Sequence, residues 1–140
     1  MPRLVDTPFD RHFGLEIVST GDDEVRASVP VRDEIRQPVG LVHGGFYAAL
    51  AESMAVAATR AAFPDDKRVH AQSAQTSFLR PIVEGTVHAA GRARHRGRTT
   101  WVWEVEITDD HGRLCALVRM TIAVRDASGD AAADGATPAA

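Results

Sequence analysis

The sequence predicts an α+β domain in which an antiparallel sheet wraps around one long central helix. Segments of alternating apolar and polar residues predict five or six strands, and one apolar stretch from Gly45 to Ala62 predicts a single helix. The helix sequence is apolar on nearly all sides, so we expect it to be buried on nearly all sides. One buried helix and several antiparallel strands together favour a sheet that curls around the helix.

The expected elements follow from turn residues and from apolar spacing. Residues 1–11 are expected to be irregular or loosely helical, and residues 32–44 form a loop that leads into the helix at 45–62. Pro64 and the two aspartates after it end that helix. Strands are expected at residues 12–19, 24–31, 69–79, 85–96, 99–108 and 114–124. A second copy of the chain would cover the open edge of such a sheet, so we expect a homodimer.

Length and composition indicate one globular domain. The chain has 140 residues, of which 44% are apolar and 25% are charged. We expect a single domain over residues 1–125 and a disordered, alanine-rich tail over residues 126–140. The net charge of −3 argues against nucleic-acid binding, because phosphate contacts need an excess of Lys and Arg. The alanine-rich helix contains charged residues, so we do not expect it to span a membrane.

Cysteine and histidine usage narrows the chemistry further. Cys115 is the only cysteine, which excludes an intramolecular disulfide and a cysteine zinc site. The first residues do not resemble a secretion signal, so we expect a cytoplasmic location. The histidines lack the spacing of metal ligands, and we expect neither a metal nor a cofactor.

A histidine and two glycines stand just before the helix, and a carboxylate follows two turns into it. An ionised carboxylate such as Glu52 in an apolar helix is costly unless it is paired or neutralised, so it points to chemistry. The backbone amides of Gly44, Gly45 and Phe46 at the helix start could hold a developing oxyanion. The carboxylate could attack a carbonyl or activate water. Together these groups indicate hydrolysis of an activated acyl group.

A purely structural interpretation of the same residues stays open from spacing alone. The glycines after His43 could form only a tight turn, with the imidazole bonded to backbone carbonyls. Glu52 could be the buried ion-pair partner of Arg60 or Arg80, since perturbed carboxylates also occur in structural networks.

The segment from Gln37 to Gly45, followed by Leu50-Ala51-Glu52-Ser53, resembles the PaaI-like acyl-CoA thioesterases of the hotdog fold. The similarity is to the branch with a helix glutamate, which includes 4-hydroxybenzoyl-CoA thioesterase. It extends from about His12 to Val124 and includes the segment from Thr76 to Pro81. The resemblance implies hydrolysis of an acyl-CoA to the free acid and CoA without a cofactor. It also implies homodimers that usually pair into homotetramers, with each site formed between two subunits.

The resemblance implies a role for each matching residue. Glu52 matches the carboxylate that acts as nucleophile, through an acyl-enzyme anhydride, or as general base on water. Gly44 matches the glycine whose amide polarises the thioester carbonyl, Gln37 matches a side chain that positions the thioester, and His43 orients the loop. Arg80 and the two threonines opening the strand at 99–108 match positions near the pantetheine and phosphates. The residues expected to bind substrate are Gly45, Phe46, Ser53, Arg80, Thr99 and Thr100.

One position departs from the family pattern. In the glutamate branch a threonine one turn after the acid helps to place the water, and this chain has Val56 there. Ser53 or Thr59 could take over that task. The departure affects the details of the hydrolytic step and leaves the reaction class unchanged.

Arg92, Arg94, Arg96 and Arg98 alternate along one expected strand, which would place them on one face. They could be a solvated, charged strand that discourages sheet pairing, or a landing site for the phosphates of CoA. RNA binding is disfavoured, because the neighbouring tryptophans are spaced as core residues.

Two other function classes and the identity of the acyl group stay open at this point. A hotdog hydratase would need an Asp/His segment that the loop lacks, and a non-catalytic acyl-CoA sensor would need a DNA-binding segment for which residues 1–11 are too short. Phe46, Tyr47, Met54 and Phe78 suggest an aromatic or medium-chain acyl group, although core packing explains them equally well.

Overall fold

The computed structural model describes residues 7–127 and contains two α-helices, one 3₁₀ helix and six strands. The helices are α1 (Pro8–Phe13), η1 (Asp33–Ile35) and α2 (Gly44–Ala61). The strands are β1 (Glu16–Thr20), β2 (Glu24–Pro30), β3 (Lys67–Phe78), β4 (Thr86–Arg96), β5 (Thr100–Thr108) and β6 (Leu114–Asp126).

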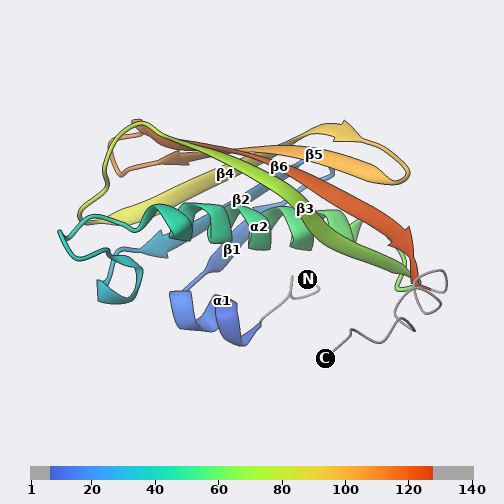
Figure 1. Cartoon of the computed structure of the whole chain (residues 1–140), viewed down its shortest axis with the longest axis horizontal. Helices are drawn as coiled ribbons and strands as arrows, with labels where there is room; N and C mark the ends of the chain where they lie inside the picture. Colours follow the sequence, from blue (N-terminus) through green and yellow to red (C-terminus); the bar gives the residue numbers. More distant parts are fainter. Residues whose placement is uncertain (1–6, 128–140) are drawn as a thin grey trace, which may run out of the picture.

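The six strands form one antiparallel sheet in the order β1-β2-β4-β5-β6-β3, and α2 runs along its inner face (Figure 1). The predicted arrangement of one long helix wrapped by an antiparallel sheet is therefore confirmed. The two outermost strands are β1 and β3, and each is hydrogen-bonded to a single neighbouring strand in the part of the chain that the structure describes. Of these two, β3 is the longer, with 12 residues.

The core lies between α2 and the inner face of the sheet. Leu50 and Met54 of α2 pack with Trp103 of β5 and other fully buried side chains of the sheet. The Thr59 hydroxyl in this core is satisfied, because it donates to the Ala55 carbonyl at 2.7 Å and accepts from the Trp103 indole at 2.9 Å. Because this buried hydroxyl has hydrogen-bond partners, its burial does not carry the free-energy cost of an unsatisfied polar group.

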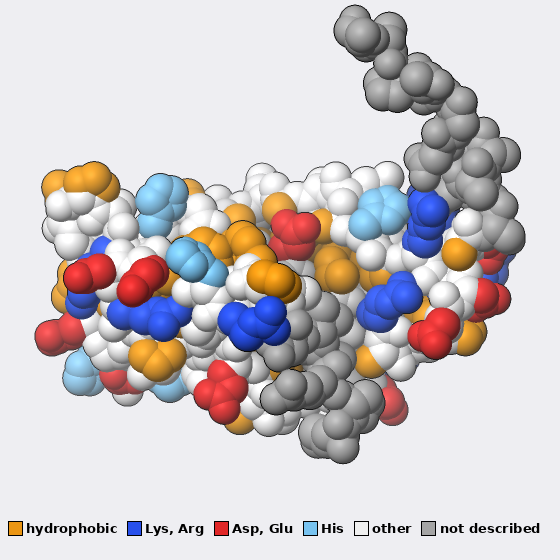
Figure 2. Space-filling model, turned by 90° about the horizontal axis from the view of Figure 1, so that it is seen from below, with side chains coloured by type: hydrophobic (Ala, Val, Ile, Leu, Met, Phe, Trp, Pro, Cys, Tyr) orange, Lys and Arg blue, Asp and Glu red, His pale blue; other side chains and the backbone are white. Residues whose placement is uncertain are grey.

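The expectation that α2 is buried on nearly all sides is wrong. Gly45 and Glu52 are exposed, and Ala48, Ala49 and Val56 on the same stripe are half-buried. These positions follow the spacing of one helix face, which points away from the sheet. Apolar side chains therefore reach the surface on the side of α1 and α2, among acidic and basic ones (Figure 2). The sequence misled because alanine tolerates a half-exposed position as readily as a buried one.

The N-terminal segment also differs from the prediction, which placed a strand at residues 12–19. Thr7 caps α1 by accepting from the Asp10 amide at 3.1 Å, and Gly14 ends it in the left-handed conformation with φ 71°. The strand β1 begins only at Glu16. Phe13, interpreted as a strand residue from its alternation, instead belongs to α1 and packs on Phe46 with ring centroids 5.8 Å apart.

The last strand is longer than predicted and includes Asp126, which was assigned to the tail. Asp126 is paired in register with Lys67 of β3, and the two side chains form an ion pair. The rest of the expected tail, from residue 128, lies outside the described residues. Among the residues that are described, no helix is long and apolar enough to cross a membrane.

Candidate active site

The start of α2 leaves one of the three expected amides available. His43 is the N-cap, and its Nδ1 accepts from the Gly45 amide at 2.9 Å. The Phe46 amide donates to the His43 carbonyl at 3.0 Å. The expectation of three free donors is therefore wrong, and within residues 7–127 the Gly44 amide is the one without an acceptor. The His43 imidazole fixes the conformation of the first turn of α2. The free Gly44 amide therefore lies at the positive end of the helix dipole.

Gly44 lines a groove of about 420 Å³, which we call the entrance groove. The ring of Phe78 lies directly against Gly44, since a Cβ added there would be 2.7 Å from its Cε1. Phe78 itself is 62% exposed, so its ring has room to move. The groove is lined by Leu41, Val42, Gly44, Tyr47, Phe78, Leu79, Arg80 and Pro81. Gly44 and Arg80, two residues predicted for the site, are thus brought together.

Tyr47 contributes a buried wall to the entrance groove. The side chain is 3% exposed, and its hydroxyl has no hydrogen-bond partner in the described part of the chain. Burial raises the pKa of Tyr47 to about 12, although the nearby Ile82 backbone amide acts in the opposite direction. The phenol therefore stays protonated at neutral pH, and this wall of the groove carries no charge.

Gln37 lies in the loop just before the entrance groove. Its side-chain oxygen accepts from the Val39 amide at 2.7 Å, and its own backbone amide donates to the Leu41 carbonyl at 2.8 Å. The loop is closed by Gly40 at φ 94°, a conformation that favours glycine. With its oxygen engaged, Gln37 has its amide NH₂ group left to offer a ligand.

Glu52 lies in a second pocket, of about 340 Å³, which we call the carboxylate pocket. The side chain is exposed and has no ion-pair or hydrogen-bond partner among the described residues. The alternative of a structural ion pair between Glu52 and Arg60 does not occur. Arg60 Nη1 instead donates to the Lys67 carbonyl at 2.6 Å. The carboxylate pocket is lined by Thr7, Phe9, Asp10, Ala49, Glu52, Ser53, Val56 and Ala57.

A second carboxylate in the carboxylate pocket, Asp10 of α1, was not anticipated. Asp10 is 8% exposed and accepts from the hydroxyls of Ser53 at 2.8 Å and Thr7 at 2.9 Å. The Thr-Pro-x-Asp start of α1 was a usable signal for a capped helix. Ser53 is thus engaged in holding α1, and the fully buried Thr59 is engaged in the core. Neither replaces the family threonine at Val56 in this arrangement.

Four of the six predicted substrate-binding residues line neither pocket: Gly45, Phe46, Thr99 and Thr100. Thr99 and Thr100 stand at the start of β5, where Trp101 packs on Phe63 at 5.8 Å. This contact places them at the C-terminal end of α2, opposite to the entrance groove. Phe46 is 6% exposed and belongs to the core, so its placement gives no support to a contact with substrate.

Gly44 and Glu52 do not converge within one chain. They are eight residues apart, so about 12 Å separates them along the axis of α2. Their pockets have no lining residue in common, one being bounded by the end of β3 and the other by α1. A carbonyl held by an amide at hydrogen-bond distance must also lie within about 3–3.5 Å of its nucleophile. Within one chain, these two groups therefore lie too far apart to act on the same carbonyl.

The prediction that four arginines share one face of a strand is wrong. A register shift between Ala93 and His95 interrupts the alternation. Arg96 is consequently on the same face of the sheet as Trp101, and its exposed guanidinium lies over that ring, 4.8 Å from the centroid. Trp101 and Trp103 are core residues, as their spacing predicted. This prediction was the reason given against RNA binding.

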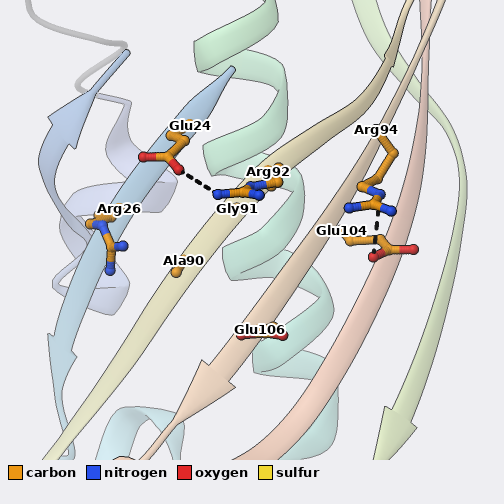
Figure 3. A pocket seen from close by; sticks show the side chains of 8 residues that line it. All are labelled: Glu24, Arg26, Ala90, Gly91, Arg92, Arg94, Glu104 and Glu106. Carbon is orange, nitrogen blue, oxygen red and sulfur yellow. Dashed lines mark hydrogen bonds and ion pairs between the residues drawn. The ribbon is translucent and has the colours of Figure 1, made fainter. Parts of the chain in front are cut away.

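Arg92 and Arg94 lie on the outer face of the sheet, in a pocket of about 230 Å³ lined by acidic and basic side chains (Figure 3). Arg98 lies in the turn between β4 and β5. Arg92 pairs with Glu24 at 2.9 Å, and Arg94 lies 3.8 Å from Glu104. This pairing supports the solvated-strand interpretation for Arg92 and Arg94. In residues 7–127 no three or more His, Cys, Asp or Glu side chains are arranged to hold a metal ion.

A six-stranded antiparallel sheet wrapped around one long helix is the hotdog fold, and comparisons with known proteins identify a thioester hydrolase of this fold. The profile of the thioesterase superfamily matches residues 39–116. The chain is 36% identical over 113 residues to the proofreading thioesterase EntH of Cronobacter turicensis, covering 81% of this chain and 82% of that protein. A crystal structure of a Haemophilus influenzae thioesterase aligns with a TM-score of 0.83 and 31% identity, covering 89% of this chain and 87% of that one. The chain therefore belongs to the thioesterase superfamily.

Two mutant structures of one relative are also similar to this chain. A Staphylococcus aureus thioesterase has been solved with a glutamate replaced by alanine and, separately, with a glutamine replaced by alanine. Both are 27% identical to this chain, with TM-scores of 0.82 and 0.83, covering 84% and 85% of this chain and 98% and 99% of that protein. The two mutated positions are fifteen residues apart in that protein.

Proposed function

We propose that the chain hydrolyses acyl-CoA thioesters at a site shared by two protomers, with Glu52 from one and Gly44 from the other. Thioester hydrolysis is the chemistry of the superfamily, and the acyl-CoA substrate and the acting residues are the proposed part. The observation that carries the proposal is the state of Glu52. It is an exposed carboxylate without a partner in the described chain, beside a pocket with several apolar walls.

The proposed reaction begins with the thioester carbonyl oxygen accepting from the Gly44 amide, with the α2 dipole behind it. Glu52 then attacks the carbonyl carbon, the carbon–sulfur bond breaks, and CoA leaves as a thiolate that takes a proton from solvent. Water hydrolyses the resulting anhydride to the free acid and regenerates the carboxylate. The alternative is that Glu52 takes a proton from water, whose oxygen attacks the same carbon. Both routes need the same oxyanion donor, worth about 3 kcal/mol.

The long edge strand β3 supports a two-protomer site. Its free edge offers unpaired backbone groups that a second copy would satisfy by antiparallel pairing. Because a two-fold axis exchanges equivalent surfaces, such a dimer would have two identical sites. Pairing of dimers into a homotetramer remains a proposal from the resemblance.

The spacing of the mutated residues in the Staphylococcus aureus relative supports the same pair of residues here. Gln37 and Glu52 are fifteen residues apart, as are the glutamine and the glutamate replaced in that protein. We propose that the Gln37 amide group donates to the thioester beside Gly44. Binding of CoA by Arg80, Thr99 and Thr100, placement in the 4-hydroxybenzoyl-CoA branch and a cytoplasmic location stay predictions.

The test is thiol release from a panel of acyl-CoA thioesters by the wild type, Glu52→Gln and Glu106→Gln. Glu106 is an exposed glutamate on the outer face of the sheet and serves as the matched control. We expect Glu52→Gln to lose thiol release while it keeps the wild-type melting temperature and oligomeric state. Full activity of Glu52→Gln would overturn the proposal. Binding of acyl-CoA by the wild type without turnover would support a sensor instead.

A further inference from the structure

Tyr47 has a buried hydroxyl that the proposed reaction leaves without a role. Among the described residues, three buried side-chain atoms have no hydrogen-bond partner: Arg32 Nε, Tyr47 Oη and Trp101 Nε1. Of these three residues, Tyr47 is the one that lines a pocket described above, the entrance groove. A buried hydroxyl without a partner costs folding free energy, so its presence beside a groove points to a partner that arrives from outside the chain.

Tyr47 and Gly44 are neighbours on the first turn of α2. They are three residues apart, and such positions lie about 5–6 Å from each other on a helix surface. The Tyr47 side chain leans back toward the start of the helix, which brings its hydroxyl toward the level of the Gly44 amide. The Phe78 ring packs beside Tyr47 with centroids 6.3 Å apart and also lies directly against Gly44. Two hydrogen-bond donors of α2 are therefore next to the same aromatic ring.

The Tyr47 hydroxyl is suited to donate a hydrogen bond and not to give up its proton. Burial raises the pKa of Tyr47 to about 12, so the phenol is a donor throughout the neutral range. The hydroxyl is covered by atoms of its own chain, so a second protomer that docks on the surface does not by itself supply the missing partner. A ligand that enters the groove and moves the exposed Phe78 ring aside would supply one.

We propose that Tyr47 is a second oxyanion donor, with its hydroxyl hydrogen-bonded to the thioester carbonyl oxygen beside the Gly44 amide. The inference rests on the hydrolysis proposed above and adds a catalytic residue to it. Charge develops on this oxygen as the carbonyl carbon becomes tetrahedral, so a donor aimed at it stabilises the transition state more than the substrate. The phenol keeps its proton, and the bonds that form and break are those of the hydrolysis already described.

The test is Tyr47→Phe, which removes the hydroxyl and keeps the ring. Thiol release from the acyl-CoA that the wild type hydrolyses fastest gives kcat and KM, and urea unfolding gives the stability. We expect kcat to fall by about 10²-fold while KM stays within about threefold of wild type. The urea midpoint should rise, because the variant no longer buries an unpaired hydroxyl. A residue with a structural role alone would not combine lower activity with higher stability.

Two controls match this variant. Thr59→Val removes a buried hydroxyl that has both of its partners, so it should lower the urea midpoint and leave kcat unchanged. Tyr47 is the only tyrosine of the chain, so biosynthetic incorporation of a ring-fluorinated tyrosine alters this residue alone and keeps its hydroxyl. This labelled protein should keep kcat within about threefold of wild type.

The outcomes separate this inference from the proposed function. A kcat of Tyr47→Phe within about threefold of wild type, or a raised KM with an unchanged kcat, overturns the role of Tyr47 while Glu52-dependent hydrolysis stands. An equal loss of kcat in the fluorinated protein overturns it as well. Retained thiol release by Glu52→Gln would instead overturn the proposed function. A fall of kcat in Tyr47→Phe, with activity kept in both controls, supports the inference.

Discussion

The substitution Gly44→Ala tests the oxyanion donor with the least change to the fold. A Cβ at this position would lie 2.7 Å and 2.9 Å from Cε1 and Cζ of Phe78, closer than carbon atoms normally approach. Phe78 is 62% exposed, so we expect the ring to swing aside rather than the helix to break. Alanine also favours the helix by about 0.5–1 kcal/mol over glycine, which offsets part of the strain. The free energy of unfolding should therefore change by no more than about 1 kcal/mol.

Activity should respond far more strongly than stability to Gly44→Ala. The new methyl group and the displaced Phe78 ring would occupy the approach to the amide, and loss of one oxyanion donor lowers kcat by about 10²–10³-fold. The assay is thiol release under saturating acyl-CoA, together with urea unfolding of the same protein. The matched control is Gly21→Ala, since a Cβ at Gly21 meets no atom within 4 Å. Activity of Gly44→Ala within twofold of wild type would refute the assignment of this amide.

Two further predictions concern stability. Ser53→Ala removes a hydroxyl donor from the buried Asp10 carboxylate and should cost about 1–3 kcal/mol in urea unfolding; an unchanged midpoint would contradict the tie between the two helices. The hydrogen bond from His88 holds the pKa of Asp110 below its usual value. The ionised carboxylate therefore stabilises the fold fully above that usual value, and the effect is lost as the pH falls from there through the lowered pKa of the folded state. The difference in melting temperature between wild type and Asp110→Asn should therefore be larger at pH 7 than at pH 3, and a constant difference would argue against this linkage.

The sequence was sufficient for the architecture, because alternation along the strands and the long apolar run are set by burial on one face of a sheet. It failed at α1, where Phe13 alternates like a strand residue although Thr7 and Gly14 are helix caps. It also failed at the strand carrying Arg96, because a bulge shifts alternation by one residue without any marking in the sequence.

The candidate site was predicted in part. Gly44 and Glu52 were singled out by type and spacing, but their placement in two separate pockets depends on the direction of side chains around α2. Asp10 was missed, because its contact with Ser53 spans 43 residues and follows from tertiary packing alone. Burial of Glu52 was predicted and not found, because the stripe of alanines beside it is half-buried rather than covered.

Subunit complementation tests the shared site most directly. Glu52→Gln and Gly44→Ala proteins, each inactive, are mixed under conditions that allow subunit exchange, and heterodimers are confirmed with a tag on one variant. If each site combines Glu52 of one protomer with Gly44 of its partner, each heterodimer has one intact site, and random exchange restores about a quarter of wild-type thiol release. No recovery in a sample with demonstrated heterodimers would contradict a site built from two chains.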